Sequence, residues 1–248
     1  MAGHSKWANI KHRKGAQDKK RSKLFTKLLK EIAVATKEGG PDTDSNPRLR
    51  LAIQNARKAN VPKDNINRAI NKGSGSDGTN YDEITLEGYA PNGIAVFVEC
   101  LTDNNRRTVA NIRSYFNKYG GSLGTNGSVS FMFERKGVFI IPVDGRDEEE
   151  FTFELLEEDG GIEDVIVEGD NFIVTCPFES YGQANAMFET LKIEPDSSTL
   201  ERIPTTTNTL TVDQAKTVMK LIDIIEDDDD VQNVFHNMEM TEEIMNAL

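Results

Sequence analysis

The feature that most constrains the fold is a change in hydrophobic periodicity across residues 73–78, which read Gly-Ser-Gly-Ser-Asp-Gly. Before this run, apolar residues such as Leu24 and Leu28 recur three and four positions apart, which is typical of helices. After it, residues 81–89 and 94–101 show the patterns of β-strands, and the second is apolar on both faces, as in a central strand. We therefore predict a domain boundary within the glycine- and serine-rich run.

Three short helices are predicted in residues 1–80. The first begins with Ser22 as N-cap, the second with Asn46-Pro47, and the third after Pro62. Their apolar stripes are narrow, so they predict a small helical bundle of limited core.

A complete β-α-β-β-α-β order is predicted between residues 138 and 203, and it is the order of a ferredoxin-like unit. The predicted elements are strand 138–143, helix 148–157, strands 165–167 and 172–175, helix 181–191 and an extended segment 198–203.

A weaker form of the same order surrounds this unit. The predicted elements are strand 94–101, helix 105–119 and strand 129–133 before it, and strand 206–211, helix 213–225 and strand 231–235 after it. The prediction is an α+β protein with three domains, in which one ferredoxin-like domain is inserted at the central hairpin of another. The domains are a basic arm and helical domain (1–80), a discontinuous α/β domain (81–136 and 205–248) and an inserted α/β domain (137–204).

Charge is distributed unevenly along the chain. Residues 1–80 carry 18 Lys and Arg against 7 Asp and Glu, a net charge of +11, whereas residues 81–248 carry 11 against 34, a net charge of −23. The first 21 residues hold seven Lys and Arg and the single acid Asp18. This pattern favours a basic arm that binds a polyanion over a merely uneven solvated surface. Trp7 in the arm could stack on an unpaired base or anchor the arm to the helical domain.

Motifs of catalysis and metal binding are missing from the sequence. It contains no nucleophile elbow, zinc-protease helix or Walker loop, and its histidines are dispersed at His4, His12 and His236. Glycines in residues 120–127 fit a helix stop and turn better than a phosphate cradle. We expect no enzyme, no cofactor and no metal site. The absence of a long apolar segment and of a secretory signal predicts a cytoplasmic protein without a membrane partner, and Cys100 and Cys176 cannot form a disulfide framework.

Two charged clusters remain open to two interpretations each. The acidic run 226–230 follows a predicted helix, where negative charge opposes the helix dipole. A solvated turn is favoured, and the alternative is a site that holds the basic arm against the body. Arg106 and Arg107 open the helix 105–119, where they could bind a phosphate or form ion pairs with the acidic body.

The sequence resembles the YebC/PmpR family over essentially its whole length. The matching segments are MAGHSKWANIKHRK (1–14), QDKKR (17–21), NPRLR (46–50), NRAI (67–70), EGY (87–89), ECLTDN (99–104), GGSLG (120–124), GSV (127–129) and DDVQNVFHN (229–237). Many members read Asn-Arg-Asn-Arg where this chain has Asn104-Asn105-Arg106-Arg107, so the match places Arg107 but not Arg106. The resemblance implies an N-terminal helical domain followed by two α/β domains.

The resemblance also implies a nucleic-acid partner. Bacterial members are described as probable transcriptional regulators that bind DNA, and mitochondrial relatives as translational activators. The predicted nucleic-acid-binding residues are His4, Lys6, Trp7, Lys11, His12, Arg13, Lys14, Lys19, Lys20, Arg21, Arg48, Arg50 and Arg107.

Two functions follow as hypotheses. The first is a monomeric, DNA-binding transcriptional regulator, although the sequence shows no clear recognition helix or dimer zipper. The alternative is a translation factor that binds ribosomal RNA on the ribosome, because a basic arm with aromatic and amide side chains suits irregular RNA. We take DNA as the predicted partner and ribosomal RNA as the alternative.

Overall fold

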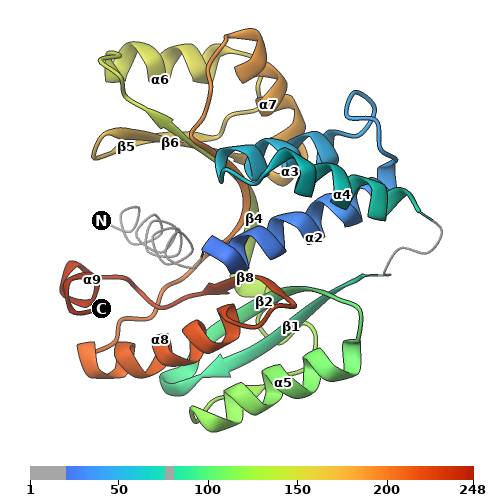
Figure 1. Ribbon diagram of the computed structural model, residues 1–248. Helices are drawn as coiled ribbons and strands as arrows, with labels where there is room; N and C mark the ends of the chain where they lie inside the picture. Colours follow the sequence, from blue (N-terminus) through green and yellow to red (C-terminus); the bar gives the residue numbers. More distant parts are fainter. Residues whose placement is uncertain (1–20, 76–80) are drawn as a thin grey trace. The chain divides into compact units, whose positions relative to one another are not determined.

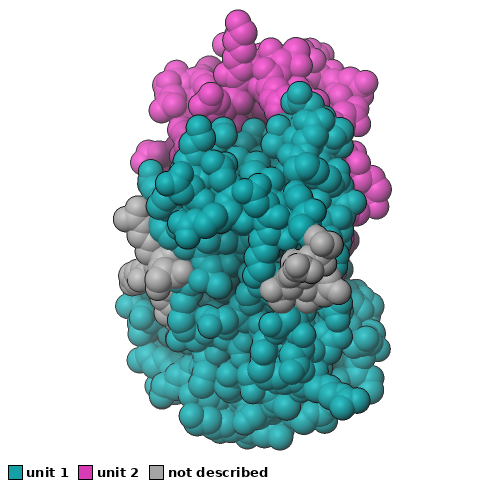
Figure 2. Space-filling view, turned by 45° about the vertical axis from the view of Figure 1, so that its right-hand side comes forward, with its two compact units in different colours: residues 1–133, 204–248 teal, residues 134–203 magenta. Residues whose placement is uncertain are grey.

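The computed structural model of the chain describes residues 21–75 and 81–248 (Figure 1). It divides into two compact units (Figure 2). One comprises the described residues up to Phe133 together with Pro204–Leu248, and the other comprises Glu134–Ile203. The division into three domains stays a prediction.

The helical region of the first unit consists of helices α2 (Arg21–Gly39), α3 (Pro47–Lys58) and α4 (Lys63–Ser74). Asn46 caps α3 as predicted, and its side chain accepts a hydrogen bond from the Leu49 N–H at 3.0 Å. Ser22 lies inside α2, so it is not the N-cap. Helix α4 passes close to α2 at Gly73, where an added Cβ would lie 2.4 Å from the Ala33 carbonyl oxygen. Nine buried residues form the core of this region: Ile32, Ala35, Leu49, Ala52, Ile53, Ala56, Val61, Ile66 and Ala69.

A four-stranded antiparallel sheet forms the rest of the first unit, in the order β3-β1-β2-β8. Its elements are β1 (Asp82–Ala90), β2 (Ile94–Thr102), α5 (Asn105–Lys118), β3 (Ser122–Leu123), α8 (Val212–Glu226), β8 (Val231–His236) and the terminal helix α9 (Glu242–Ala247). Helices α5 and α8 lie on one face of the sheet (Figure 1). Strand β2 is buried on both faces, because Val96 and Val98 pack towards these helices and Phe97 packs on the other side.

This sheet has the strand order of a ferredoxin-like fold. The strand expected third in the chain order of such a fold is, however, supplied by a segment that precedes the other strands. Strand β1 occupies that position between β2 and β3, whereas the predicted strand 206–211 contributes a single bridge between Asn208 and Met238. The predicted strand 129–133 is also wrong. Residues Ser130–Met132 form a 3-10 turn, and Phe131 within it is exposed. Val129 and Phe133 on either side of the turn are buried against β2 and β8. The apolar character of the segment therefore reflects the buried residues that flank the turn.

The second unit confirms the predicted ferredoxin-like order. Its elements are β4 (Phe133–Pro142), α6 (Glu148–Glu157), β5 (Asp164–Glu168), β6 (Asn171–Pro177), α7 (Tyr181–Thr190) and β7 (Ser197–Pro204). The sheet order is β5-β6-β4-β7. Aromatic pairs fill the space between sheet and helices: Phe139 lies 4.8 Å from Phe188, and Phe151 lies 4.6 Å from Phe172, between ring centroids. The protein is thus an α+β protein with a helical N-terminal region and two antiparallel sheets.

Candidate nucleic-acid interface

Most of the residues predicted to bind nucleic acid precede the described part of the chain. Arg21 begins α2, but its side chain is not among those described. Three predicted residues, Arg48, Arg50 and Arg107, can be placed in the structure. The residues outside the described ranges are His4, Lys6, Trp7, Lys11, His12, Arg13, Lys14, Lys19 and Lys20.

Helices α3 and α4 are joined by only four residues, 59–62. Asn60 takes a left-handed conformation with φ of 59°, and the Val61 N–H donates to the Ala56 carbonyl oxygen at 2.9 Å. These two features end α3, and the burial of Val61 fixes the start of the next helix. Two helices joined by such a short turn have the connectivity of a helix-turn-helix unit.

Helix α4 buries Ile66 and Ala69 and exposes a polar face on its other side. This face, which we call the α4 polar face, consists of Lys63, Asp64, Asn67, Arg68, Asn71 and Lys72. Arg68 donates to the Asn65 side-chain oxygen at 2.7 Å and to the Asp64 carbonyl oxygen at 3.3 Å, and no carboxylate among the described residues pairs with it. Sequence reasoning missed this face, although the asparagines spaced four residues apart signalled it.

Arg48 is surrounded by carboxylates. Its guanidinium lies 2.7 Å from Glu31 and 2.6 Å from Glu38, and it also pairs with Glu83 at the start of β1. Burial opposes the charged form of Arg48, but the hydrogen bonds and charges of Glu31 and Glu83 outweigh it and raise its pKa. The side chain joins the helical region to the sheet, and its predicted role at nucleic acid stays a prediction. Arg50 is half-buried and has no ion pair among the described residues.

Of the two interpretations of Arg107, phosphate binding and ion pairing, the structure shows the ion pairs. Its Nη2 atom lies 2.8 Å from Asp103 Oδ1 and 2.5 Å from Asp230 Oδ2. Asn104 caps the same helix, and its side chain accepts from the Arg107 N–H at 3.1 Å. The guanidinium thus already has two carboxylate partners, and its contact with nucleic acid stays a prediction.

Asp230 lies in the acidic run but is only 5% exposed. Its Oδ1 accepts from Lys30 Nζ at 2.9 Å, and its Oδ2 accepts from the hydroxyls of Thr102 at 3.2 Å and Thr108 at 2.9 Å. Burial alone would raise the pKa of Asp230, but hydrogen bonds from Arg107, Lys30 and Thr108 lower it to about 2. The prediction of a solvated turn is therefore wrong for this residue.

Three lysines on one face of α2, which we call the α2 lysine stripe, explain how the acidic run is tolerated after α8. Their Nζ atoms donate to backbone carbonyls: Lys23 to Asp227 at 2.8 Å, Lys27 to Glu226 at 3.1 Å and Lys30 to Asp229 at 2.6 Å. Carbonyls at a helix C-terminus carry partial negative charge, which cations stabilise. The acidic run thus holds the α2 lysine stripe. The alternative named the basic arm, of which residues 1–20 lie outside the described residues, and it stays a prediction.

The glycine-rich segment after α5 contains backbone N–H groups that bind a carboxylate of the protein itself. Gly120, with φ of 78°, follows the end of α5, which confirms the predicted helix stop. Glu87, only 4% exposed, accepts from the N–H groups of Gly127, Val129 and Ser130 at 2.8, 2.7 and 2.8 Å. The anion position of this loop is therefore occupied by Glu87.

The cysteines are not activated as nucleophiles. Cys100 and Cys176 are free and buried, and burial raises their pKa values to about 12 and about 11. Within residues 21–75 and 81–248, no three His, Cys, Asp or Glu side chains gather in a way that could hold a metal ion. No helix in these ranges has both the length and the apolar character needed to span a bilayer.

The structure thus defines a class of protein in which a basic helical region precedes a ferredoxin-like sheet that is interrupted by a second ferredoxin-like unit. Residues 5–76 match the model of the TACO1/YebC protein N-terminal domain, and residues 81–238 match that of the TACO1/YebC second and third domain. The chain belongs to the TACO1/YebC family, which confirms the resemblance seen in the sequence.

Curated relatives match the chain over nearly its whole length. A probable transcriptional regulatory protein of Syntrophotalea carbinolica is 52% identical over 99% of this chain and 98% of its own. A probable transcriptional regulatory protein of Amoebophilus asiaticus is 52% identical over 96% of this chain and 98% of its own. The crystal structure of a conserved hypothetical protein from Aquifex aeolicus is 41% identical, covers 91% of this chain and 93% of its own, and superposes with a TM-score of 0.81. The relatives' names support a regulatory role in general.

Proposed function

We propose that this protein regulates transcription by binding duplex DNA through helices α3 and α4. The observation that carries the proposal is the short turn between these helices together with the exposed polar face of the second. In a helix-turn-helix unit the second helix enters the major groove, where arginine pairs with guanine and asparagine with adenine. Arg68 and Asn67 have the side chains for these two contacts.

Backbone phosphates would be held around the start of α4. Its N-cap position is Pro62, which supplies no side-chain hydrogen bond to the first turn. Open N–H groups, the positive end of the helix dipole and the exposed Lys63 favour a phosphate there, whereas the exposed carboxylate of Asp64 in the same turn opposes it. The predicted basic arm, residues 1–21, precedes this region in the chain and supports the proposal through its charge.

Ribosomal RNA is the second candidate partner, and one observation favours it. The acidic residues 81–248 carry a net charge of −23, so the cationic surface belongs mainly to the N-terminal region. A long duplex would be repelled wherever it met the acidic remainder, whereas a short RNA loop can bind a small cationic surface alone.

The test is duplex binding by the full chain at physiological salt, with fragments selected from a random-sequence pool. Arg68→Ala should weaken binding to the selected site by about 5- to 150-fold and relax the preference at one base pair, since a bidentate contact contributes about 1–3 kcal/mol. Lys216→Ala, at an exposed position on α8, is the control. Failure to select any preferred duplex sequence, with equal binding by both variants, would overturn the proposal.

Crosslinking in cells followed by sequencing of the bound nucleic acid separates the two candidates. Reads at discrete promoters would support the transcriptional regulator. Reads concentrated on ribosomal RNA would replace it with the translation factor, and binding to DNA would then be a consequence of charge alone.

A further inference from the structure

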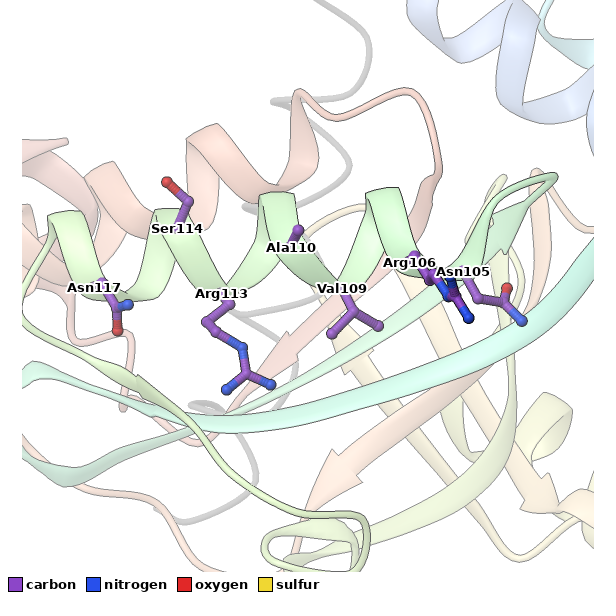
Figure 3. A pocket seen from close by; sticks show the side chains of 7 residues that line it. All are labelled: Asn105, Arg106, Val109, Ala110, Arg113, Ser114 and Asn117. Carbon is purple, nitrogen blue, oxygen red and sulfur yellow. The ribbon is translucent and has the colours of Figure 1, made fainter.

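The outward face of α5 forms a shallow groove that includes Arg106 (Figure 3). It is open to solvent, and its volume is about 660 Å³. Its lining residues all come from α5: Asn105, Arg106, Val109, Ala110, Arg113, Ser114 and Asn117. We call this feature the α5 groove.

The α5 groove carries two arginines that lack acidic partners. Arg106 and Arg113 are exposed, and neither forms a hydrogen bond or ion pair with any described residue. Their situation contrasts with that of Arg107, which Asp103 and Asp230 hold in place. Both unpaired arginines lie in a segment with 34 acidic residues, so a surface arginine there has many carboxylates available. Two exposed arginines without such pairs make the groove cationic within an acidic part of the chain.

The spacing and lining of the groove suit a polymer strand. Arg106 and Arg113 are seven residues apart, which is about 10 Å along the helix axis. Figure 3 shows Val109 between them and on the same side of the helix as Arg113. Val109 is half-buried against the core, and the small side chain of Ala110 leaves the surface beside it open. Val109 and Ala110 thus form an apolar surface between two guanidinium groups. Such a surface suits a ligand in which a flat apolar group lies between two anionic groups.

We propose that the α5 groove binds a single-stranded segment of nucleic acid, with one phosphate at Arg106, another at Arg113, and the intervening base and sugar over Val109 and Ala110. A base can lie on this floor only when it is unstacked, which favours a single strand over a duplex. The amide of Asn117 at one end supplies a further hydrogen-bond donor, whereas the Asn105 amide at the other end already donates to Asp82 Oδ2 at 3.0 Å. The inference rests on the proposed function in one respect: it adds a second contact to a protein whose partner is nucleic acid.

The test measures binding of fluorescein-labelled 12-nucleotide oligouridylate and oligothymidylate to the full chain by fluorescence anisotropy over a series of salt concentrations. In the double variant Arg106→Ala and Arg113→Ala we expect a loss of affinity of about tenfold or more. The slope of log affinity against log salt should flatten by about 1.4, because each phosphate contact on a single strand contributes about 0.7. The matched control is Lys216→Ala with Lys220→Ala, which removes two exposed cations from α8 in the same unit.

Circular dichroism checks that both double variants fold, as we expect because alanine is favourable at exposed helical positions. Equal losses in the two double variants, or an unchanged salt slope in the arginine variant, would overturn the α5 groove as a binding site. If the arginine variant loses more affinity for oligouridylate than for oligothymidylate, the groove binds RNA and contacts its 2′-hydroxyl groups. If it loses more affinity for oligothymidylate, the groove binds single-stranded DNA.

Arg68→Ala separates this inference from the proposed function. If Arg68→Ala weakens duplex binding while the α5 arginines leave single-strand binding unchanged, the groove proposal fails and the DNA-binding function stands. If the α5 arginines control single-strand binding while Arg68→Ala leaves duplex binding unchanged, the duplex-binding function fails and the groove stands.

Discussion

Replacement of Asp230 by asparagine should destabilise the first unit strongly. The carboxylate is 5% exposed and accepts hydrogen bonds from Lys30, Arg107, Thr102 and Thr108. Its pKa falls from 3.8 to about 2 on folding. Since each tenfold change in proton affinity corresponds to about 1.4 kcal/mol, the lowered pKa contributes roughly 2–3 kcal/mol of stability at neutral pH.

Asparagine keeps the shape of the side chain but leaves Lys30 and Arg107 without their shared carboxylate. We therefore expect Asp230→Asn to lower the free energy of unfolding by about 2–4 kcal/mol. This is somewhat less than the roughly 3–5 kcal/mol lost when one partner of a fully buried ion pair is removed, because the Arg107 side chain is partly exposed. The assay is urea unfolding at pH 7, followed by far-ultraviolet circular dichroism.

Asp229→Asn provides a matched control, because this neighbouring aspartate is exposed and only its backbone carbonyl binds Lys30. It should change the free energy of unfolding by no more than about 0.5 kcal/mol. Equal destabilisation by the two variants would show that net charge, and not the contacts of Asp230, is responsible. A value for Asp230→Asn close to wild type would refute the reasoning outright.

Three further predictions follow from the structure. The stabilisation from Asp230 is fully present above pH 3.8 and is lost as pH falls towards about 2, so acid titration of unfolding should show a steeper loss in this window for the wild type than for Asp230→Asn. Asn46→Ala removes the α3 cap and the amide donor to the carbonyls of Ala35 and Gly40; it should cost about 1–3 kcal/mol in thermal or urea unfolding, and a loss below about 0.5 kcal/mol would contradict this expectation. Glu87→Gln weakens the charge-assisted bonds to three backbone N–H groups and should cost about 1–3 kcal/mol, with faster amide hydrogen exchange at Val129; unchanged exchange there would show that the carboxylate does not hold the loop.

Local patterns in the sequence were sufficient to predict much of the fold. The helical period before residue 73 and the strand period after residue 81 separate the helical region from the sheets. The ferredoxin-like order of residues 138–203 could be predicted because its elements are consecutive and each shows its own period. The cap at Asn46 and the helix stop at Gly120 depend on neighbouring residues only.

Contacts between distant segments decided what the sequence by itself did not. Strand β1 took the place predicted for strand 206–211, because it pairs with β2 across the short turn Pro91–Gly93 and its other edge then pairs with the more distant β3. Residues 129–133 looked like a strand because a turn flanked by buried residues and a short strand can have the same apolar composition.

The candidate sites show the same division between sequence and tertiary structure. The sequence determined that positive charge gathers in residues 1–80 and that Arg106 and Arg107 open a helix. Only the tertiary structure brought Asp230, 123 residues further along the chain, against Arg107 and left Arg106 without a carboxylate. The physical reason is that ion pairing and burial depend on distances through space, and the inserted unit places these two partners far apart in sequence.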